Sequence, residues 1–108
     1  MVDNVLRVTF GKELKIKSRP LYQYDYGQKL KFLDLNLPEA YEVHFSNYEH
    51  GTATVTVATS NEVAIPDVYL QTGLNIFVWL YLHAGQNDGE TEYMLIIPVI
   101  RRAAILDT

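Results

Sequence analysis

The sequence predicts an all-β domain: an antiparallel β-sandwich, Ig-like or jelly-roll-like, of about eight or nine strands and without substantial helix. Apolar and polar residues alternate with period two along most of the chain, and no segment shows a helical repeat. Turn-forming residues interrupt the alternation roughly every eight to twelve positions. Short alternating segments between regularly spaced turns are typical of sandwiches and barrels.

The first half of the chain contains the clearest alternation. The segment "AYEVHFS" directs Tyr41, Val43 and Phe45 to one face of a strand and Glu42 and His44 to the other. Charged and apolar residues also alternate in the segments before it. We therefore expect further strands within residues 5–10, 14–16, 21–28 and 29–38.

The second half contains the two strongest strand predictions, "NIFVWLYLHAG" at 75–85 and "TEYMLIIPVIRR" at 91–102. Between them, "AGQNDGE" predicts a hairpin turn, because Asn and Gly accept positive φ. The Thr–Val alternation of "TATVTVATS" (52–60) is typical of a half-solvated strand. The segment 61–73 is less regular, and its Pro66 indicates a strand end or an edge.

Length and composition predict one domain over residues 1–100, followed by a tail or the start of a connector at 101–108. The 108 residues carry a net charge of -4 and no basic block longer than Arg101–Arg102, so we expect no nucleic-acid partner. The absence of cysteine excludes disulfides and thiol catalysis. The N-terminus lacks a signal-peptide pattern, and the longest apolar stretch is too short for a membrane helix, so we expect no membrane insertion.

Four groups that titrate or bind metals lie close together in "EAYEVHFSNYEHG": Glu42, His44, Glu49 and His50. A zinc site needs three or four ligands, and the third histidine, His83, belongs to another predicted strand. We interpret the cluster as an outward strand face followed by a turn. Known catalytic and metal-binding motifs are absent from the sequence. We therefore expect a protein that is not an enzyme and has no catalytic residues, cofactor or metal site.

The two strongest strands have no polar face. Phe77, Trp79 and Tyr81 oppose the apolar residues between them on one strand, and the next strand presents Met94, Ile96 and Ile100 on one side. A sandwich strand in a monomer usually has one polar face. Two explanations stay open: the rest of the domain wraps both faces, or another subunit or domain covers one of them. The second explanation predicts an interface formed by these six residues.

Tyr22, Tyr24 and Tyr26 lie at alternate positions of "LYQYDYGQ", which places them on one side of an extended chain. They could form a stacking platform for sugar rings or for a partner protein. We favour the alternative that they cover one edge of the core and keep their hydroxyls at the surface.

About half of the chain resembles the short N-terminal β-domain of tail and baseplate structural proteins of phages and prophages of Gram-positive bacteria. The matching segments are "VTFG" (8–11), "LYQYDYGQKLKF" (21–32), "LNLPEAYEVHFSN" (35–47), "IPDVYLQTG" (65–73), "VWLYLH" (78–83) and "DGETEY" (88–93). The resemblance implies a virion structural module, assembled in the bacterial cytoplasm, that docks onto other tail or baseplate proteins. We expect docking through apolar strand faces and sheet edges, and we expect a homo-oligomer. The alternative is a carbohydrate-binding module for cell-surface polysaccharide, with Trp79 or the three tyrosines as stacking surfaces.

Overall fold

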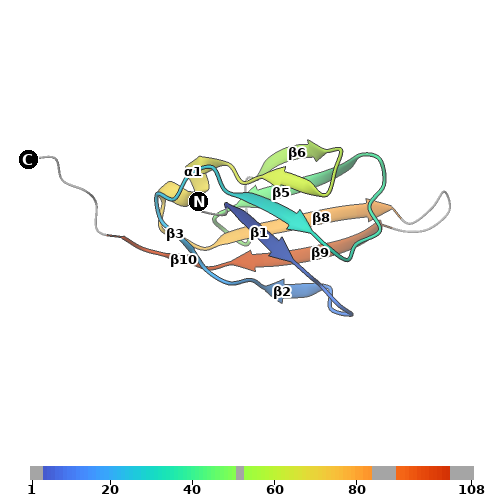
Figure 1. Ribbon diagram of the computed structural model, residues 1–108, viewed down its shortest axis with the longest axis horizontal. Helices are drawn as coiled ribbons and strands as arrows, with labels where there is room; N and C mark the ends of the chain where they lie inside the picture. The colour runs from blue at the N-terminus through green and yellow to red at the C-terminus, as the bar shows by residue number, and fades with distance from the viewer. Residues whose placement is uncertain (1–3, 51–52, 84–89, 103–108) are drawn as a thin grey trace, which may run out of the picture.

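A computed structural model describes residues 4–50, 53–83 and 90–102 and confirms the all-β class (Figure 1). It contains one five-residue helix, α1 (Asp67–Gln71), and no helix long and apolar enough to cross a membrane within the described ranges. Ten strands are described: β1 (Val5–Val8), β2 (Lys15–Lys17), β3 (Leu21–Tyr22), β4 (Lys29–Phe32), β5 (Tyr41–Ser46), β6 (Thr54–Ala58), β7 (Glu62–Ala64), β8 (Ile76–His83), β9 (Glu90–Ile97) and β10 (Val99–Ile100).

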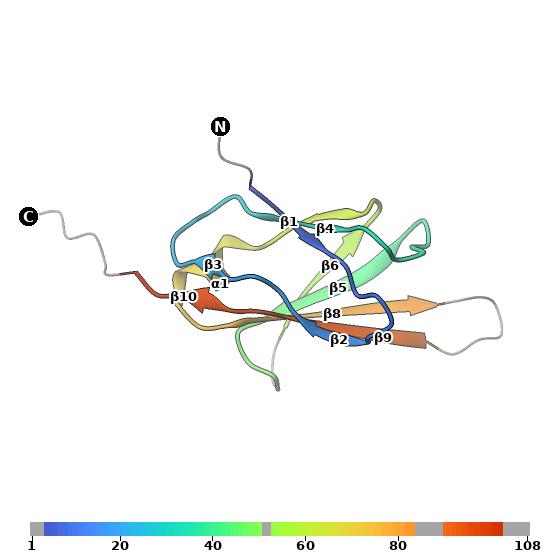
Figure 2. The same cartoon turned by 60° about the horizontal axis from the view of Figure 1, so that its bottom comes forward.

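The strands form a five-stranded sheet in the order β2-β9-β8-β5-β6, a three-stranded sheet β1-β4-β7 and a two-stranded pair β10-β3. Figures 1 and 2 show the three-stranded sheet lying across one face of the five-stranded sheet. Leu30 and Phe32 from one sheet and Val43, Phe45 and Leu80 from the other are buried between the two layers. Alternation assigned Val43 and Phe45 to the core, and the structure confirms that assignment.

The prediction of a purely antiparallel arrangement is wrong. The pairs β1–β4, β2–β9 and β3–β10 are parallel, while the other four described pairs are antiparallel. Alternation reports which face of a strand is buried but not the direction of the neighbouring strand. The three amino-terminal strands join partners that are distant in sequence, so adjacent segments of the chain gave no information about these pairs.

The parallel pairs β2–β9 and β3–β10 follow one another along the same two stretches of chain. Ser18 N donates to Ile96 O, and Leu21 N donates to Pro98 O, each at 2.9 Å. Lys17 is in register with Ile96, whereas Leu21 is in register with Val99, so the stretch 17–21 contains one residue more than its partner. The extra residue lies in "SRP", and it changes which alternate positions face inward, as in a β-bulge.

The expected extended strand over 21–28 is also wrong. The strand ends at Tyr22, Tyr24 adopts φ 69°, and Asp25 N donates to Tyr22 O at 3.1 Å, so the chain turns. A positive φ is unusual for tyrosine. The buried Gln23 side chain accounts for the turn, because it donates to Gln71 O at 2.7 Å and accepts from Arg102 N at 3.0 Å. These bonds join the turn to the end of α1 and to the chain after β10.

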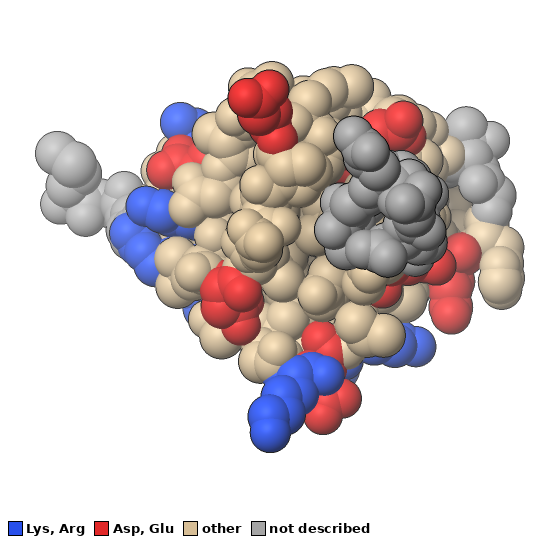
Figure 3. Space-filling view, turned by 90° about the vertical axis from the view of Figure 1, so that its right-hand side faces the viewer, with Lys and Arg blue, Asp and Glu red and all other residues tan. Residues whose placement is uncertain are grey.

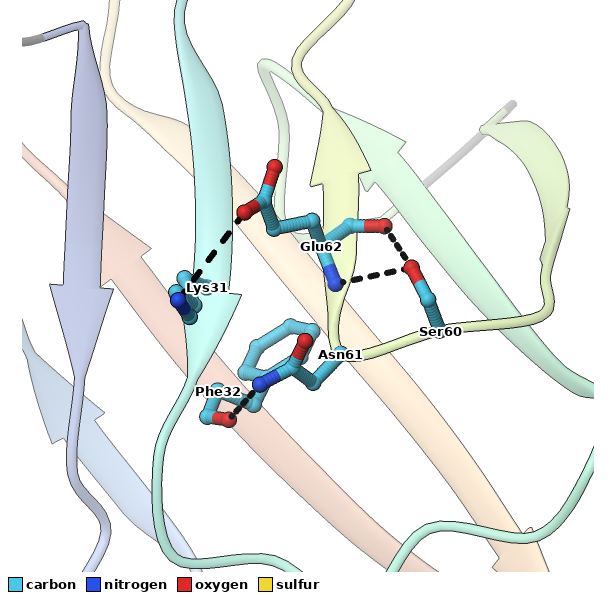
Figure 4. Close-up of polar contacts among 5 residues, drawn as sticks. All are labelled: Lys31, Phe32, Ser60, Asn61 and Glu62. Atoms are coloured by element: carbon cyan, nitrogen blue, oxygen red, sulfur yellow. Dashed lines mark hydrogen bonds and ion pairs between the residues drawn. The ribbon is translucent and has the colours of Figure 1, made fainter.

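The turn between β6 and β7 joins the two layers and is fixed by polar contacts within the turn and with β4 (Figure 4). Ser60 Oγ accepts from Glu62 N and donates to Glu62 O, both at 3.2 Å. Asn61 Nδ2 donates to Phe32 O at 3.2 Å, and the Glu62 carboxylate lies 4.0 Å from Lys31 Nζ. The end of β6 is therefore tied to β4 of the opposite layer.

The segments at both ends of the chain and at the expected hairpin turn are described in part. Arg101 and Arg102 have no regular secondary structure, and the rest of the expected tail, 103–108, lies outside the described residues. The expected turn 84–89 also lies outside them, but β8 and β9 pair as antiparallel neighbours. This pairing confirms the predicted hairpin.

Candidate functional site

The outer face of the five-stranded sheet, turned away from the three-stranded sheet, carries five of the six residues expected at an interface. β8 presents Phe77, Trp79 and Tyr81 there, and β9 presents Met94 and Ile96. The register aligns Phe77 with Ile96 and Trp79 with Met94. All five side chains are half-buried. The rings of Phe77 and Trp79 are stacked, with centroids 6.1 Å apart and planes inclined by 22°.

The sixth residue, Ile100, does not belong to this sheet. Pro98 separates β9 from β10, and Ile100 lies in β10 in register with the exposed Tyr22 of β3. The expectation that all six residues lie on one continuous strand face is therefore corrected. Pro98 is the physical reason, because proline cannot donate a hydrogen bond to a strand ladder.

The first part of the histidine–carboxylate cluster lies on the same outer face. Glu42 is in register with Tyr81, and His44 with Trp79. His44 Nε2 lies 3.0 Å from Glu42 Oε1, and the His44 ring meets the Tyr81 ring edge to face at a centroid distance of 4.7 Å. The outward position predicted for Glu42 and His44 is confirmed. The structure adds that these residues border the tryptophan.

The outer face contains a hollow of about 480 Å³. It brings together Trp79 and the histidine–carboxylate cluster, which lie in separate segments of the sequence. It is lined by His44, Glu49, His50, Ala53, Trp79, Tyr81, Glu92 and Met94. Glu49 and His50 follow β5 in the chain, and they line the hollow together with Ala53, which precedes β6. The Tyr81 hydroxyl lies 3.5 Å from Glu92 Oε1. No lysine or arginine lines this hollow among the described residues, so its polar groups are carboxylates, imidazoles and a phenol.

This arrangement provides an aromatic surface with acidic groups around it. Within the described ranges, no group of three or more His, Asp or Glu side chains is placed to hold a metal ion. His44 and Glu42 form a pair, and the neighbouring Tyr81 and Trp79 provide flat apolar surfaces. Such a surface can stack against a ring or pack against apolar side chains of a protein.

The free edge of β6 extends the outer face, and sequence reasoning did not identify it. β6 is the last strand of the five-stranded sheet, and its Val55 and Val57 are 52% and 65% exposed. They lie in register with His44 and Glu42 on β5. Residues 52–60 carry no charge, but this composition does not distinguish an edge strand from a central one, so the edge becomes visible only in the assembled sheet.

Tyr22, Tyr24 and Tyr26 are exposed, but they lie on β3 and the turn after it rather than along one strand face. The Arg102 guanidinium carbon lies 4.8 Å from the centroid of the Tyr22 ring. The three tyrosines therefore surround a turn next to Ile100 and form a second exposed aromatic region, separate from the residues that line the hollow.

Charged side chains are dispersed among neutral ones at the end of the molecule shown in Figure 3, with no continuous basic surface in that view. Comparison with models of known protein families and with curated protein sequences finds no match.

Proposed function

We propose that this chain is a non-enzymatic structural domain of a phage or prophage tail or baseplate, incorporated in the virion. It docks onto neighbouring tail or baseplate proteins through the outer face of the five-stranded sheet and the free edge of β6. The phage context rests on the sequence resemblance described above, and the docking surface rests on the geometry. Ile100 and the exposed tyrosines around it provide a second contact region.

The observation that carries the proposal is the arrangement of the outer face. Phe77, Trp79, Met94 and Ile96 occupy its centre on two neighbouring strands and are half-buried. Charged residues flank them on two sides: Lys15 and Lys17 on the β2 side, and Glu42 and Glu92 at the Tyr81 end. An aromatic and apolar centre with a charged rim is typical of protein interfaces, where a few aromatic side chains supply most of the binding energy.

The experiment follows a tagged chain into phage particles in the bacterium that encodes it. The variants Trp79→Glu and Ile96→Glu place a charge at the centre of the face, while Leu33→Glu places one at an exposed leucine after β4 as the matched control. We expect the wild type and Leu33→Glu in purified particles at equal amounts, and both outer-face variants to be depleted at least about tenfold.

Circular dichroism confirms that each variant is folded before the particles are compared. Two results would overturn the proposal: wild-type chain absent from purified particles, or folded Trp79→Glu and Ile96→Glu present in the same amount as the wild type.

One observation favours a second candidate, the carbohydrate-binding module. The hollow places Trp79 and Tyr81 beside Glu49 and Glu92, so a sugar could stack its C–H face on an aromatic ring and donate its hydroxyls to the carboxylates. The absence of lysine and arginine from the described lining favours neutral over acidic saccharides.

Trp79 is the only tryptophan of the chain, so its fluorescence reports on this hollow directly. Titration with neutral cell-wall oligosaccharides should shift the emission, and Glu92→Gln should weaken binding. A parallel titration of Tyr22→Ala tests the second aromatic region. If the emission does not change and neither variant alters retention on immobilised polysaccharide, the carbohydrate candidate is wrong and docking to protein remains.

A further inference from the structure

We propose that the free edge of β6 pairs antiparallel with β6 of a second copy of this chain. The two five-stranded sheets then become one continuous sheet across a two-fold axis. This inference rests on the proposed function, because it names the partner that occupies one part of the docking surface.

β6 is the strand edge best suited to accept a partner. Its five residues contain no charge, proline or glycine, and β5 is its only described partner in the sheet. Proteins protect strand edges with short strands, charged side chains or proline. The other outer strands of the two larger sheets carry a charged residue: Arg7 in β1, Glu62 in β7, and two lysines in β2.

A second copy fits this edge because the strand is complementary to itself. In an antiparallel pair centred on Thr56, Thr56 meets Thr56 and Val55 meets Val57 of the other copy. Both valines are exposed on the outer face, so the pairing forms two valine–valine contacts there and brings no like charges together. The same operation on β2 would place lysines opposite lysines, which is unfavourable.

The edge is held in place at both ends before a partner arrives. The Tyr41 hydroxyl donates to Ser60 O at 2.5 Å, just after β6, and the Thr54 hydroxyl bonds to the Tyr69 hydroxyl at its start. A strand that is already fixed loses less conformational entropy on binding. Because the paired edge is only five residues long, we expect a dissociation constant on the order of micromolar rather than a permanent dimer.

The first test measures the mass of the full chain by sedimentation over about 1 to 500 μM. The wild type should change from monomer to dimer within this range. Val57→Lys places a cation on the paired edge and should weaken dimerisation at least about tenfold, because two lysines then face the partner strand. Val68→Lys makes the same change at a valine of α1 that is 55% exposed, and it should dimerise like the wild type.

The second test fixes the register with cysteine, which the natural sequence lacks. Thr56→Cys should form a disulfide-linked dimer under mild oxidation, because directly opposed residues in an antiparallel pair have Cα atoms about 5 Å apart. Thr59→Cys is the control. In the proposed register its two copies lie roughly 20 Å apart and should not cross-link.

The outcomes separate this inference from the proposed function. A wild type that stays monomeric throughout, a Val57→Lys chain that dimerises as well as Val68→Lys, or equal cross-linking of both cysteine variants would overturn β6 pairing. Incorporation into particles would still stand in those cases if Trp79→Glu blocks it. If Val57→Lys disrupts the dimer but the wild-type chain never enters particles, β6 pairing stands and the proposed function is overturned.

Discussion

The two edges of the five-stranded sheet differ in length and in charge, two properties that control strand addition. β2 is three residues long and has exposed lysines on both sides of Ile16, whereas β6 is five residues long and uncharged, with two exposed valines. Both edges belong to the same sheet and share its central strands. Short, charged edge strands discourage the addition of another strand. The comparison indicates that the sheet is protected against strand addition at β2 and lacks this protection at β6.

Removal of the lysines from β2 should produce the largest change. In Lys15→Thr/Lys17→Thr both edges become uncharged, so each molecule can pair on two sides and chains can grow without closing. We expect the sedimenting mass to rise beyond the dimer as concentration increases. If this variant associates no more than the wild type, the two lysines are not what distinguishes β2 from β6.

A substitution in a central strand should lower the free energy of unfolding without changing dimerisation through the edge of β6. Leu80 is fully buried on β8, so Leu80→Ala should lower the free energy of unfolding by about 2 to 5 kcal/mol. Urea denaturation measures this loss. The folded variant should still dimerise like the wild type, and a loss of dimer in fully folded Leu80→Ala would show that association depends on general stability.

Anchoring of the β6 end should have a smaller effect. Tyr41→Phe removes the hydroxyl that donates to Ser60 O, and we expect a loss of about 1 kcal/mol in urea denaturation. Burial raises the pKa of Tyr41 above its usual value of 10.0, so the absorbance change that is lost in Tyr41→Phe should occur above that pH. If Tyr41→Phe is as stable as the wild type and cross-links equally well through Thr56→Cys, this bond does not hold the edge.

The smallest effect should come from the turn that leads into β2, and it should depend on pH. Phe10 N and Gly11 N donate to the Asp34 carboxylate at 3.1 and 2.7 Å, and these bonds lower the pKa of Asp34 below its ordinary value of 3.8. The folded state therefore favours the ionised Asp34 carboxylate. This preference stabilises the folded state above pH 3.8, and the stabilisation is lost as the pH falls through the lowered pKa. Asp34→Asn should have a slightly lower melting temperature than the wild type at neutral pH, and the difference should shrink as the pH falls below 3.8 and through the lowered pKa. A difference that persists unchanged in acid would exclude the carboxylate as its source.

Alternation predicted the faces of individual strands well. It assigned Val43 and Phe45 to the core and His44 to the outer face, and the structure agrees. It failed at Tyr24, where the left-handed backbone is held by Gln23 contacts with α1 and with Arg102, far away in sequence. Nothing in the tyrosine repeat distinguishes such a turn from a strand.

The composition of the hollow could be predicted only in part, because it depends on strand register. The sequence identified Trp79 and the cluster containing His44 and His50 as separate features. Their proximity requires that β5 lie beside β8 with His44 opposite Trp79, and that His50, which follows β5, lie at the same hollow. The edge position of β6 could not be predicted for a related reason. It depends on the order of all five strands in the sheet.

The parallel pairing of β2 with β9 and of β3 with β10 also has a consequence for the timing of folding. Lys15 pairs with Met94, and Leu21 with Val99, so each contact closes a loop of about eighty residues. Contacts so distant in sequence slow folding. During synthesis on the ribosome, β2 and β3 remain unpaired until residues 94–100 have been synthesised and have left the exit tunnel. The five-stranded sheet is thus completed only after β9 has left the ribosome.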